Sequence, residues 1–206
     1  MDLHEQLGSI DVYLFDQVLR GRFDRRRRIL DVGCGAGRNL RWFLRQGYEV
    51  HGLDRDPSAV DGAREQARRL AGDEAAGRFE VGDAMSMSYE AARFDAVIVN
   101  AVLHFASGPA NFDAIVRECG RVLAPGGLFF ARLCSSIGLE GRVRPLGDGR
   151  FQIPDGTRRF LVDRPALESA TAVLGGTLAD PVKTVLVEDL RAMTTWVVVK
   201  DGVGSC

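Results

Sequence analysis

Three aspartates occur at or near the ends of short apolar runs that have the length and residue types of buried strands. Asp31 is separated by one valine from the glycine-rich stretch 33–37, whereas Asp54 and Asp83 each follow a later apolar run. A carboxylate at a strand end can accept hydrogen bonds from the two hydroxyls of a ribose. Glycine backbone lets a ligand come close to a helix N-terminus. These residue types and their order predict a site for a ligand that contains a nucleoside.

The spacing of the glycines restricts the class of ligand that the turn can bind. Gly33, Gly35 and Gly37 alternate along the chain, and Arg38 occupies the position where a dinucleotide-binding turn needs its third glycine. That glycine permits close helix–strand packing, which an arginine would obstruct. No Gly-Lys-Ser/Thr sequence follows, so a Walker loop is excluded. The turn suits a ligand with one nucleoside and no pyrophosphate.

Strands and helices that alternate along the chain must position these residues. We expect strands at 29–32, 48–53, 78–81, 94–99, 128–133, 183–187 and 195–200, and helices at 38–46, 57–71, 112–123 and 164–174. Runs that are apolar on both faces and separated by helices predict a parallel sheet covered on two sides. The fold class is therefore α/β, doubly wound, with ligands at the carboxyl ends of the strands.

Two segments lie outside this alternation. Residues 1–24 have apolar side chains at helical spacing, which predicts an N-terminal helical cap, and Tyr13 within it could close over a ligand or pack. Residues 134–162 lack helical periodicity and contain a proline-initiated turn between two apolar triplets. We expect this insert to form a hairpin that acts as a lid over the ligand. The 206 residues are predicted to form a single domain.

Five motifs together resemble the class I S-adenosylmethionine-dependent methyltransferases, in particular the small-molecule subgroup called methyltransferase type 11. The motifs are Ile29-Leu30-Asp31-Val32-Gly33-Cys34-Gly35-Ala36-Gly37, Gly52-Leu53-Asp54, Gly82-Asp83-Ala84, Phe94-Asp95-Ala96-Val97 and Arg121-Val122-Leu123-Ala124-Pro125-Gly126-Gly127. The resemblance implies a Rossmann-like, mostly parallel seven-stranded sheet with an antiparallel last strand. It also implies S-adenosyl-L-methionine as cofactor and in-line methyl transfer to a small molecule.

The resemblance also assigns roles to residues that match the motifs. The methionine part of the cofactor would meet Asp31 and the turn residues Gly33, Cys34, Gly35 and Gly37, with Asn100 and Ala101 beside the methyl group. Asp54 would hold the ribose, Arg55 would lie beside the adenine, and Asp83 and the Ala84 amide would contact its edge.

On the acceptor side, His104 follows the fourth strand and is the best candidate for a general base, although a histidine there can also simply pack. Candidates for contact with the acceptor are Arg38, Arg132, Tyr13 and Arg144. Arginine forks hold carboxylates and phosphates, so an anionic acceptor is expected. The alternative for each arginine is a solvated surface.

Composition disfavours other functions. The 27 basic and 28 acidic residues give a net charge of -1, which argues against nucleic acid as a partner. No Cys-x-x-Cys pair or carboxylate cluster indicates a metal, and the separated cysteines suggest reduced thiols. The N-terminus lacks the features of a signal peptide, and no apolar run is long enough to span a membrane. We therefore expect a cytoplasmic protein.

Two other functions remain open. A non-catalytic protein that binds S-adenosylmethionine would have the same motifs, and sequence does not separate it from an enzyme. A NAD-dependent oxidoreductase on a similar fold is disfavoured by Arg38 in the third-glycine position.

Overall fold

The main sheet contains seven strands along one path and a short eighth strand at its side. The structure, a computed structural model, describes residues 2–202, without the side chain of His4. The strands lie in the order β10-β11-β5-β4-β1-β2-β3, and β9 pairs with β11. Their bounds are β1 Arg28–Val32, β2 Glu49–Asp54, β3 Phe79–Val81, β4 Phe94–Asn100, β5 Leu123–Cys134, β9 Gly176–Leu178, β10 Lys183–Val187 and β11 Arg191–Lys200.

Pairing within the sheet confirms the expected direction of its strands. β1, β2, β3, β4 and β5 pair in parallel, whereas β11 pairs antiparallel with β5 and β10. The extra strand β9 begins directly after Gly175, which ends a helix in the left-handed region at φ 76°. Three residues are too few to show an alternating pattern, which is why the sequence did not indicate this strand.

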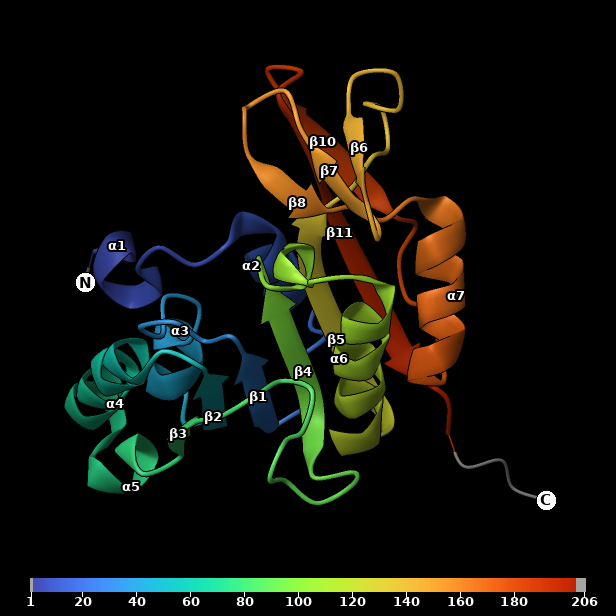
Figure 1. Ribbon diagram of the computed structural model, residues 1–206. Helices are drawn as coiled ribbons and strands as arrows, with labels where there is room; N and C mark the ends of the chain where they lie inside the picture. The colour runs from blue at the N-terminus through green and yellow to red at the C-terminus, as the bar shows by residue number, and fades with distance from the viewer. Residues whose placement is uncertain (1, 203–206) are drawn as a thin grey trace.

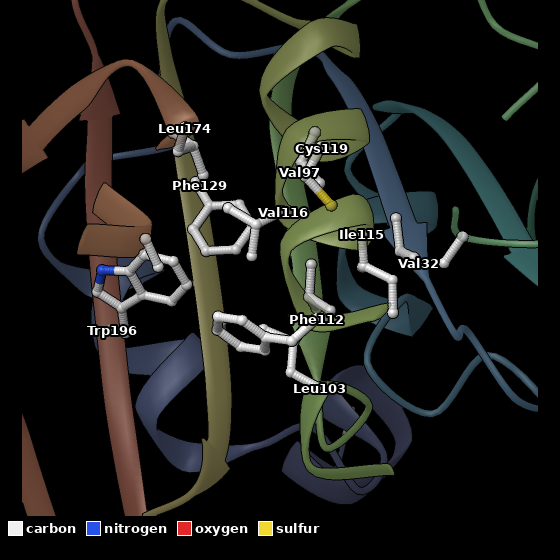
Figure 2. Packing of buried hydrophobic residues seen from close by; sticks show 14 of the residues in the cluster. Val32, Val97, Leu103, Phe112, Ile115, Val116, Cys119, Phe129, Leu174 and Trp196 are labelled. Carbon is white, nitrogen blue, oxygen red and sulfur yellow. The ribbon is translucent and has the colours of Figure 1, made fainter. Parts of the chain in front are cut away.

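Helices cover both faces of the sheet (Figure 1). α3 (Arg41–Arg45), α4 (Pro57–Ala71) and α5 (Asp73–Ala76) pack on one face, and α6 (Pro109–Val122) and α7 (Arg164–Leu174) pack on the other. Each face has its own apolar core. Figure 2 shows the second one, where Phe112 and Val116 of α6 meet Phe129 and Trp196 from the sheet. The doubly wound prediction is confirmed.

Several boundaries differ from those expected. α6 begins at Pro109 and β11 at Arg191, three and four residues earlier than predicted. The first helix after β1 begins at Arg41 instead of residue 38, because residues 35–40 form turns, with positive φ at Gly35 and Gly37. β5 begins at Leu123, although residues 124–127 had the character of a breaker. The register jumps from Leu123 to Leu128 there, so these residues form an irregular start to the strand.

The N-terminal segment and the insert lie at the carboxyl ends of the strands. The segment contains α1 (Leu3–Leu7) and α2 (Val12–Leu19), separated at Gly8, which has a φ of +62°. The insert forms a three-stranded antiparallel sheet of β6 (Arg144–Gly147), β7 (Arg150–Gln152) and β8 (Arg158–Phe160), one strand more than the expected hairpin. Figure 1 shows this small sheet beyond the arrowhead of β5. A short 3₁₀ helix, η1 (Leu103–Phe105), follows β4.

Candidate functional site

A cleft of about 360 Å³ lies at the carboxyl ends of the strands, next to the point where the strand order reverses between β1 and β4. Ligands of doubly wound sheets bind at this position. The cleft is lined by five of the residues expected at a cofactor, namely Gly33, Asp54, Arg55, Ala84 and Ala101. Its other lining residues are Leu53, Gly82, Val102, Phe105, Ala106 and Ile115.

The three glycines of the turn all have positive φ, and they differ in what surrounds each of them. Gly33 has a φ of +73°, and a Cβ there would lie 2.2 Å from Val102 Cγ2. Gly37 has a φ of +82°, and its Cβ would lie 2.8 Å from Gln66 Nε2 of α4. Gly37 is therefore needed mainly for its backbone conformation, because the end of the Gln66 side chain can move aside and the nearest α4 backbone atom would lie 3.7 Å from the Cβ. Gly35 has a φ of +53° with no atom within 4 Å of a Cβ position, so its side of the turn is open.

Most amides of the turn are already bonded within the protein. The amides of Gly33 and Cys34 both donate to the Leu53 carbonyl, at 2.7 and 3.0 Å. Gly35 donates to Asp54 Oδ2 at 2.8 Å, and the Asp56 amide donates to Asp54 Oδ1 at 3.0 Å. These bonds fix the Asp54 carboxylate against the turn while it lines the cleft.

Asp31 is buried without a partner. It is 1% exposed, and neither carboxylate oxygen has a hydrogen bond among the described residues. Burial raises the pKa of Asp31 to about 8; the Arg38 charge opposes this rise, and the Asp54 charge adds to it. The carboxyl is therefore mostly protonated at neutral pH until a positive charge comes near.

The end of β4 carries a second unpaired group. Asn100 is 6% exposed, and neither its amide nitrogen nor its amide oxygen has a partner in the described part of the chain. Ala101 follows with a φ of +63°, a conformation that costs a non-glycine residue energy. Its amide donates to the Arg132 carbonyl at 2.8 Å. An unpaired buried amide and a strained backbone in succession are typical of a functional site.

The expected adenine-side residues divide between the cleft and the turn beside it. Arg55 and Ala84 line the cleft. Asp83 is not among the lining residues, and its Oδ1 accepts a hydrogen bond from the Met85 amide at 2.9 Å. Asp83 therefore also shapes the turn that carries Ala84.

The Cys34 side chain does not line the cleft, and its sulfur lies 3.4 Å from the Gly35 carbonyl oxygen within the turn. This side chain is 5% exposed and packs in the apolar core beneath the turn, where a Cβ on Gly52 would lie 2.9 Å from the sulfur. Burial raises the pKa of the Cys34 thiol, so it stays protonated. Cys34, Cys119 and Cys134 are all free and buried, and Cys206 lies outside the described residues.

His104 is held in a defined orientation in η1. It is 6% exposed, and its Nδ1 accepts a hydrogen bond from the Cys134 amide at 3.3 Å. Burial lowers its pKa to about 4, and the charges of Arg159 and Arg191 add to this effect. The neutral ring therefore carries its proton on Nε2, and its only accepting nitrogen is occupied. A role as general base requires this hydrogen bond to break, and that role stays a prediction.

The expected acceptor residues are not brought together in the cleft. Arg132 Nη1 pairs with Asp11 Oδ2 at 3.0 Å, and the Arg132 guanidinium lies 4.6 Å from the centre of the Tyr13 ring. Arg38 is exposed outside the cleft lining. Arg144 is exposed on β6, where it donates to the Gln152 side chain, and it is not among the cleft-lining residues.

Several site residues were not expected from the sequence. Phe105 lines the cleft with 62% of its surface exposed, and Ile115 reaches it from α6. Asp11 and Asn39 are buried and joined, since the Asp11 amide donates to Asn39 Oδ1 at 3.0 Å. The position of Phe105 directly after His104 was a usable signal in the sequence, whereas a contact across 28 residues was not.

Comparison with known proteins decides the family. The sequence profile described as a methyltransferase domain matches residues 30–131, which contain the glycine turn, Asp54, Asp83 and Asn100. The chain carries a class I S-adenosylmethionine-dependent methyltransferase domain. It is similar to the ubiquinone biosynthesis O-methyltransferase of Methylocella silvestris, with 40% identity over 106 residues, or 50% of this chain and 38% of that protein.

A second curated relative is similar over a longer stretch of the chain. The 27-O-demethylrifamycin SV methyltransferase of Amycolatopsis mediterranei is 34% identical over 130 residues, covering 59% of this chain and 46% of that protein. The chain therefore spans less than half the length of both curated relatives.

Solved structures show the same fold over most of the chain. The PH0226 protein from Pyrococcus horikoshii OT3 has a TM-score of 0.73 and 24% identity over 92% of this chain and 89% of that one. An S-adenosylmethionine-dependent methyltransferase from Methanosarcina mazei has a TM-score of 0.73 and 21% identity over 90% of this chain and 97% of that one.

Residues 2–202 lack the features of two other kinds of site. No helix in this range has the length and apolar character that crossing a bilayer requires. Within the same residues, no group of three or more histidines, cysteines, aspartates or glutamates is placed to hold a metal ion.

Proposed function

We propose that this methyltransferase domain transfers a methyl group from S-adenosyl-L-methionine to a small-molecule acceptor with a negatively charged group. The main support for the cofactor site is that two buried side chains, Asp31 and Asn100, have no hydrogen-bond partners among the described residues. They lie on neighbouring strands beside the cleft. A carboxyl and an amide without protein partners fit a ligand end that bears both an ammonium and a carboxylate, as the methionine part of the cofactor does.

Each part of the cofactor has matching residues in the cleft. Asp54 would accept hydrogen bonds from the ribose, since its carboxylate is already held in place by the turn. Asp31, the turn residues Gly33, Cys34, Gly35 and Gly37, and the pair Asn100 and Ala101 would surround the methionine part. Arg55 would lie beside the adenine, with Asp83 and the Ala84 amide at its edge. These assignments rest on the family resemblance and on the cleft lining.

The protein's contribution to methyl transfer is mainly geometric. The bound cofactor supplies a methyl group on a positively charged sulfur, which a nucleophile can displace in line. The chain has to hold the acceptor in line and exclude water from the site. We propose the insert 134–162 and the N-terminal segment 1–24 as the elements that close it. His104 would remove a proton only if it releases the Cys134 amide, so turnover without a protein base is the simpler alternative.

The nature of the acceptor is supported by the relatives and by Arg132. The names of the two curated relatives describe methylation in ubiquinone biosynthesis and of a demethylrifamycin, which are small molecules. Arg132 lies two residues before the end of β5, opposite Asn100, and would bring a guanidinium to the acceptor. Oxygen is the acceptor atom that the name of the ubiquinone relative suggests. Nucleic acid stays disfavoured by the balanced charge, and the three buried free thiols suit a reducing cytoplasm.

Calorimetry with S-adenosylhomocysteine, S-adenosylmethionine and NAD tests the cofactor, and transfer of a labelled methyl group into a metabolite extract tests the activity. We expect binding of the first two ligands, no binding of NAD, and labelling of an acidic small molecule. NAD binding without S-adenosylmethionine binding would indicate an oxidoreductase. Tight cofactor binding without labelling of any metabolite would instead favour a non-catalytic binding protein.

A further inference from the structure

Buried polar atoms without hydrogen-bond partners lie at the carboxyl ends of three adjacent strands. Asp31 on β1 and Asn100 on β4 have no partners for their side-chain atoms, and the buried Nε of Arg132 on β5 has none either, among the described residues. Asn100 and Arg132 are directly opposite each other in the parallel register. Each such group costs about 1–3 kcal/mol when it is left unpaired. Their concentration indicates that Arg132 belongs to the same ligand site as the other two.

The Asp11 carboxylate and the Tyr13 ring hold Arg132 in its present position. Asp11 Oδ2 accepts from Arg132 Nη1 at 3.0 Å, and the Asp11 side chain is 5% exposed against 19% for Arg132. Asp11 Oδ1 is already used, because it accepts from the Tyr13 amide at 2.9 Å and so caps α2. Asp11 therefore contacts the arginine through one oxygen, whereas a free carboxylate can pair with an arginine fork through two.

The Asp11 contact also fastens the N-terminal segment across the site. The Asp11 amide donates to Asn39 Oδ1, and Asn39 follows the glycine turn after β1. The link Asn39–Asp11–Arg132 thus runs from the end of β1 to the end of β5, and β4 with Asn100 lies between them in the sheet. Figure 1 shows α2 close to the arrowhead of β4.

From this geometry we propose that Asp11 occupies Arg132 in place of an anionic group of the acceptor. A carboxylate or phosphate of the acceptor would replace Asp11 on Arg132, pair with both Nε and an Nη, and release the N-terminal segment from the end of β5. Acceptor binding and loosening of residues 11–20 are then one event, although the buried Leu14 and the Gln17–Asp180 hydrogen bond still tie this segment to the protein. This inference rests on the proposed function and adds its acceptor class and its gate.

Asp11→Asn is a clean test, because asparagine caps a helix as well as aspartate does but cannot neutralise Arg132. The probe is benzoate, with the neutral benzamide as its control, titrated into protein saturated with S-adenosylhomocysteine. We expect Asp11→Asn to bind benzoate at least tenfold more tightly than the wild type, with no change for benzamide. Asp16→Asn is the matched control, since Asp16 lies on the same helix and pairs with the exposed Arg20; it should leave benzoate affinity unchanged.

The double variant Asp11→Asn/Arg132→Gln removes both charges and avoids a buried, unpaired aspartate. It should lose the gain in benzoate affinity. Hydrogen exchange gives a second measurement: saturating benzoate should speed exchange in residues 11–20 of the wild-type protein. Equal benzoate affinity of Asp11→Asn and the wild type, absence of benzoate binding, an equal gain in the double variant, or unchanged exchange would each overturn the inference. The proposed function fails separately, if the wild type does not bind S-adenosylhomocysteine.

Discussion

The amide of Gly35 donates a hydrogen bond to Asp54 Oδ2 across 2.8 Å, which joins the turn after β1 to the end of β2. The carboxylate thus holds the glycine turn in place before any ligand arrives, and the same bond fixes the orientation of the carboxylate. Asp54 has two functions in this arrangement, one in the fold of the turn and one in the cleft.

Replacement of Asp54 by alanine should therefore weaken cofactor binding. We expect a loss of about 1–3 kcal/mol, the range for removing hydrogen bonds to a charged group. Calorimetry with S-adenosylhomocysteine measures it. Asp61→Ala is a suitable control, since Asp61 pairs with Arg64 on the exposed side of α4. Equal affinity of Asp54→Ala and the wild type would remove Asp54 from the ribose site.

Asp31 should make the stability of the ligand-free protein depend on pH. Its pKa is about 8 in the folded state but near 3.8 in the unfolded state, so the unfolded state alone loses this proton between those values. The contribution of Asp31 to stability is thus fully present below about pH 4 and is lost as pH rises to 8. Compared with Asp31→Asn, the wild type should lose melting temperature progressively from pH 5 to pH 8. A difference independent of pH would contradict the raised pKa.

The same Asp31→Asn variant should bind the cofactor less well although it is more stable at pH 8. The asparagine cannot ionise to meet the ammonium of the methionine part, so the favourable charge interaction is lost. Binding of S-adenosylhomocysteine at pH 8 tests this expectation. Unimpaired affinity would place the ammonium elsewhere.

His104 can be tested with two substitutions that differ in one hydrogen bond. Asparagine can still accept from the Cys134 amide, whereas alanine leaves that buried amide unpaired, at a cost of about 1–3 kcal/mol. If His104 is a general base, both variants should lose turnover at unchanged cofactor affinity. If its role is structural, His104→Asn should keep the wild-type rate and only His104→Ala should melt earlier. Steady-state rates and thermal melts separate the two cases.

Gly33→Ala should lower the stability of the protein by more than the cost of its backbone conformation alone. The positive φ costs about 1–2 kcal/mol for a residue with a Cβ, and here the new methyl would also lie 2.2 Å from Val102 Cγ2. Gly47→Ala has a similar φ of +71° with open space around it, so it measures the conformational cost alone. The double variant Gly33→Ala/Val102→Ala should recover part of the lost stability. Equal denaturation midpoints for Gly33→Ala and Gly47→Ala would contradict the steric explanation.

The sequence predicted what depends on local pattern. The bounds of α4, α7 and β10 agree with the expected ones, because helical or strand periodicity and proline or glycine boundaries mark them directly. The cleft residues Gly33, Asp54 and Ala84 follow from strand ends that must meet at one edge of a parallel sheet. The direction of β11 came from the family resemblance, since antiparallel pairing leaves no local signal in a strand apolar on both faces.

What the sequence did not predict depends on contacts between distant residues. Arg132 was a candidate for contact with the acceptor, with a solvated surface as the alternative, and its partner Asp11 lies 121 residues away. Nothing in the sequence around Arg132 indicates that pairing. Similarly, the bond between His104 and the Cys134 amide joins two elements separated by α6 and decides which ring nitrogen carries the proton.

The antiparallel strand β11 has a consequence for the order of assembly. It covers the edge of β5 over seven paired positions from Met193 to Val199, and the fully buried Trp196 packs against Phe129 with ring centres 4.9 Å apart. Until β11 adds to the sheet, the apolar edge of β5 is open to pairing with another chain. Contacts so far apart in sequence form slowly. Addition of β11 therefore closes this edge and buries Trp196 at the same time.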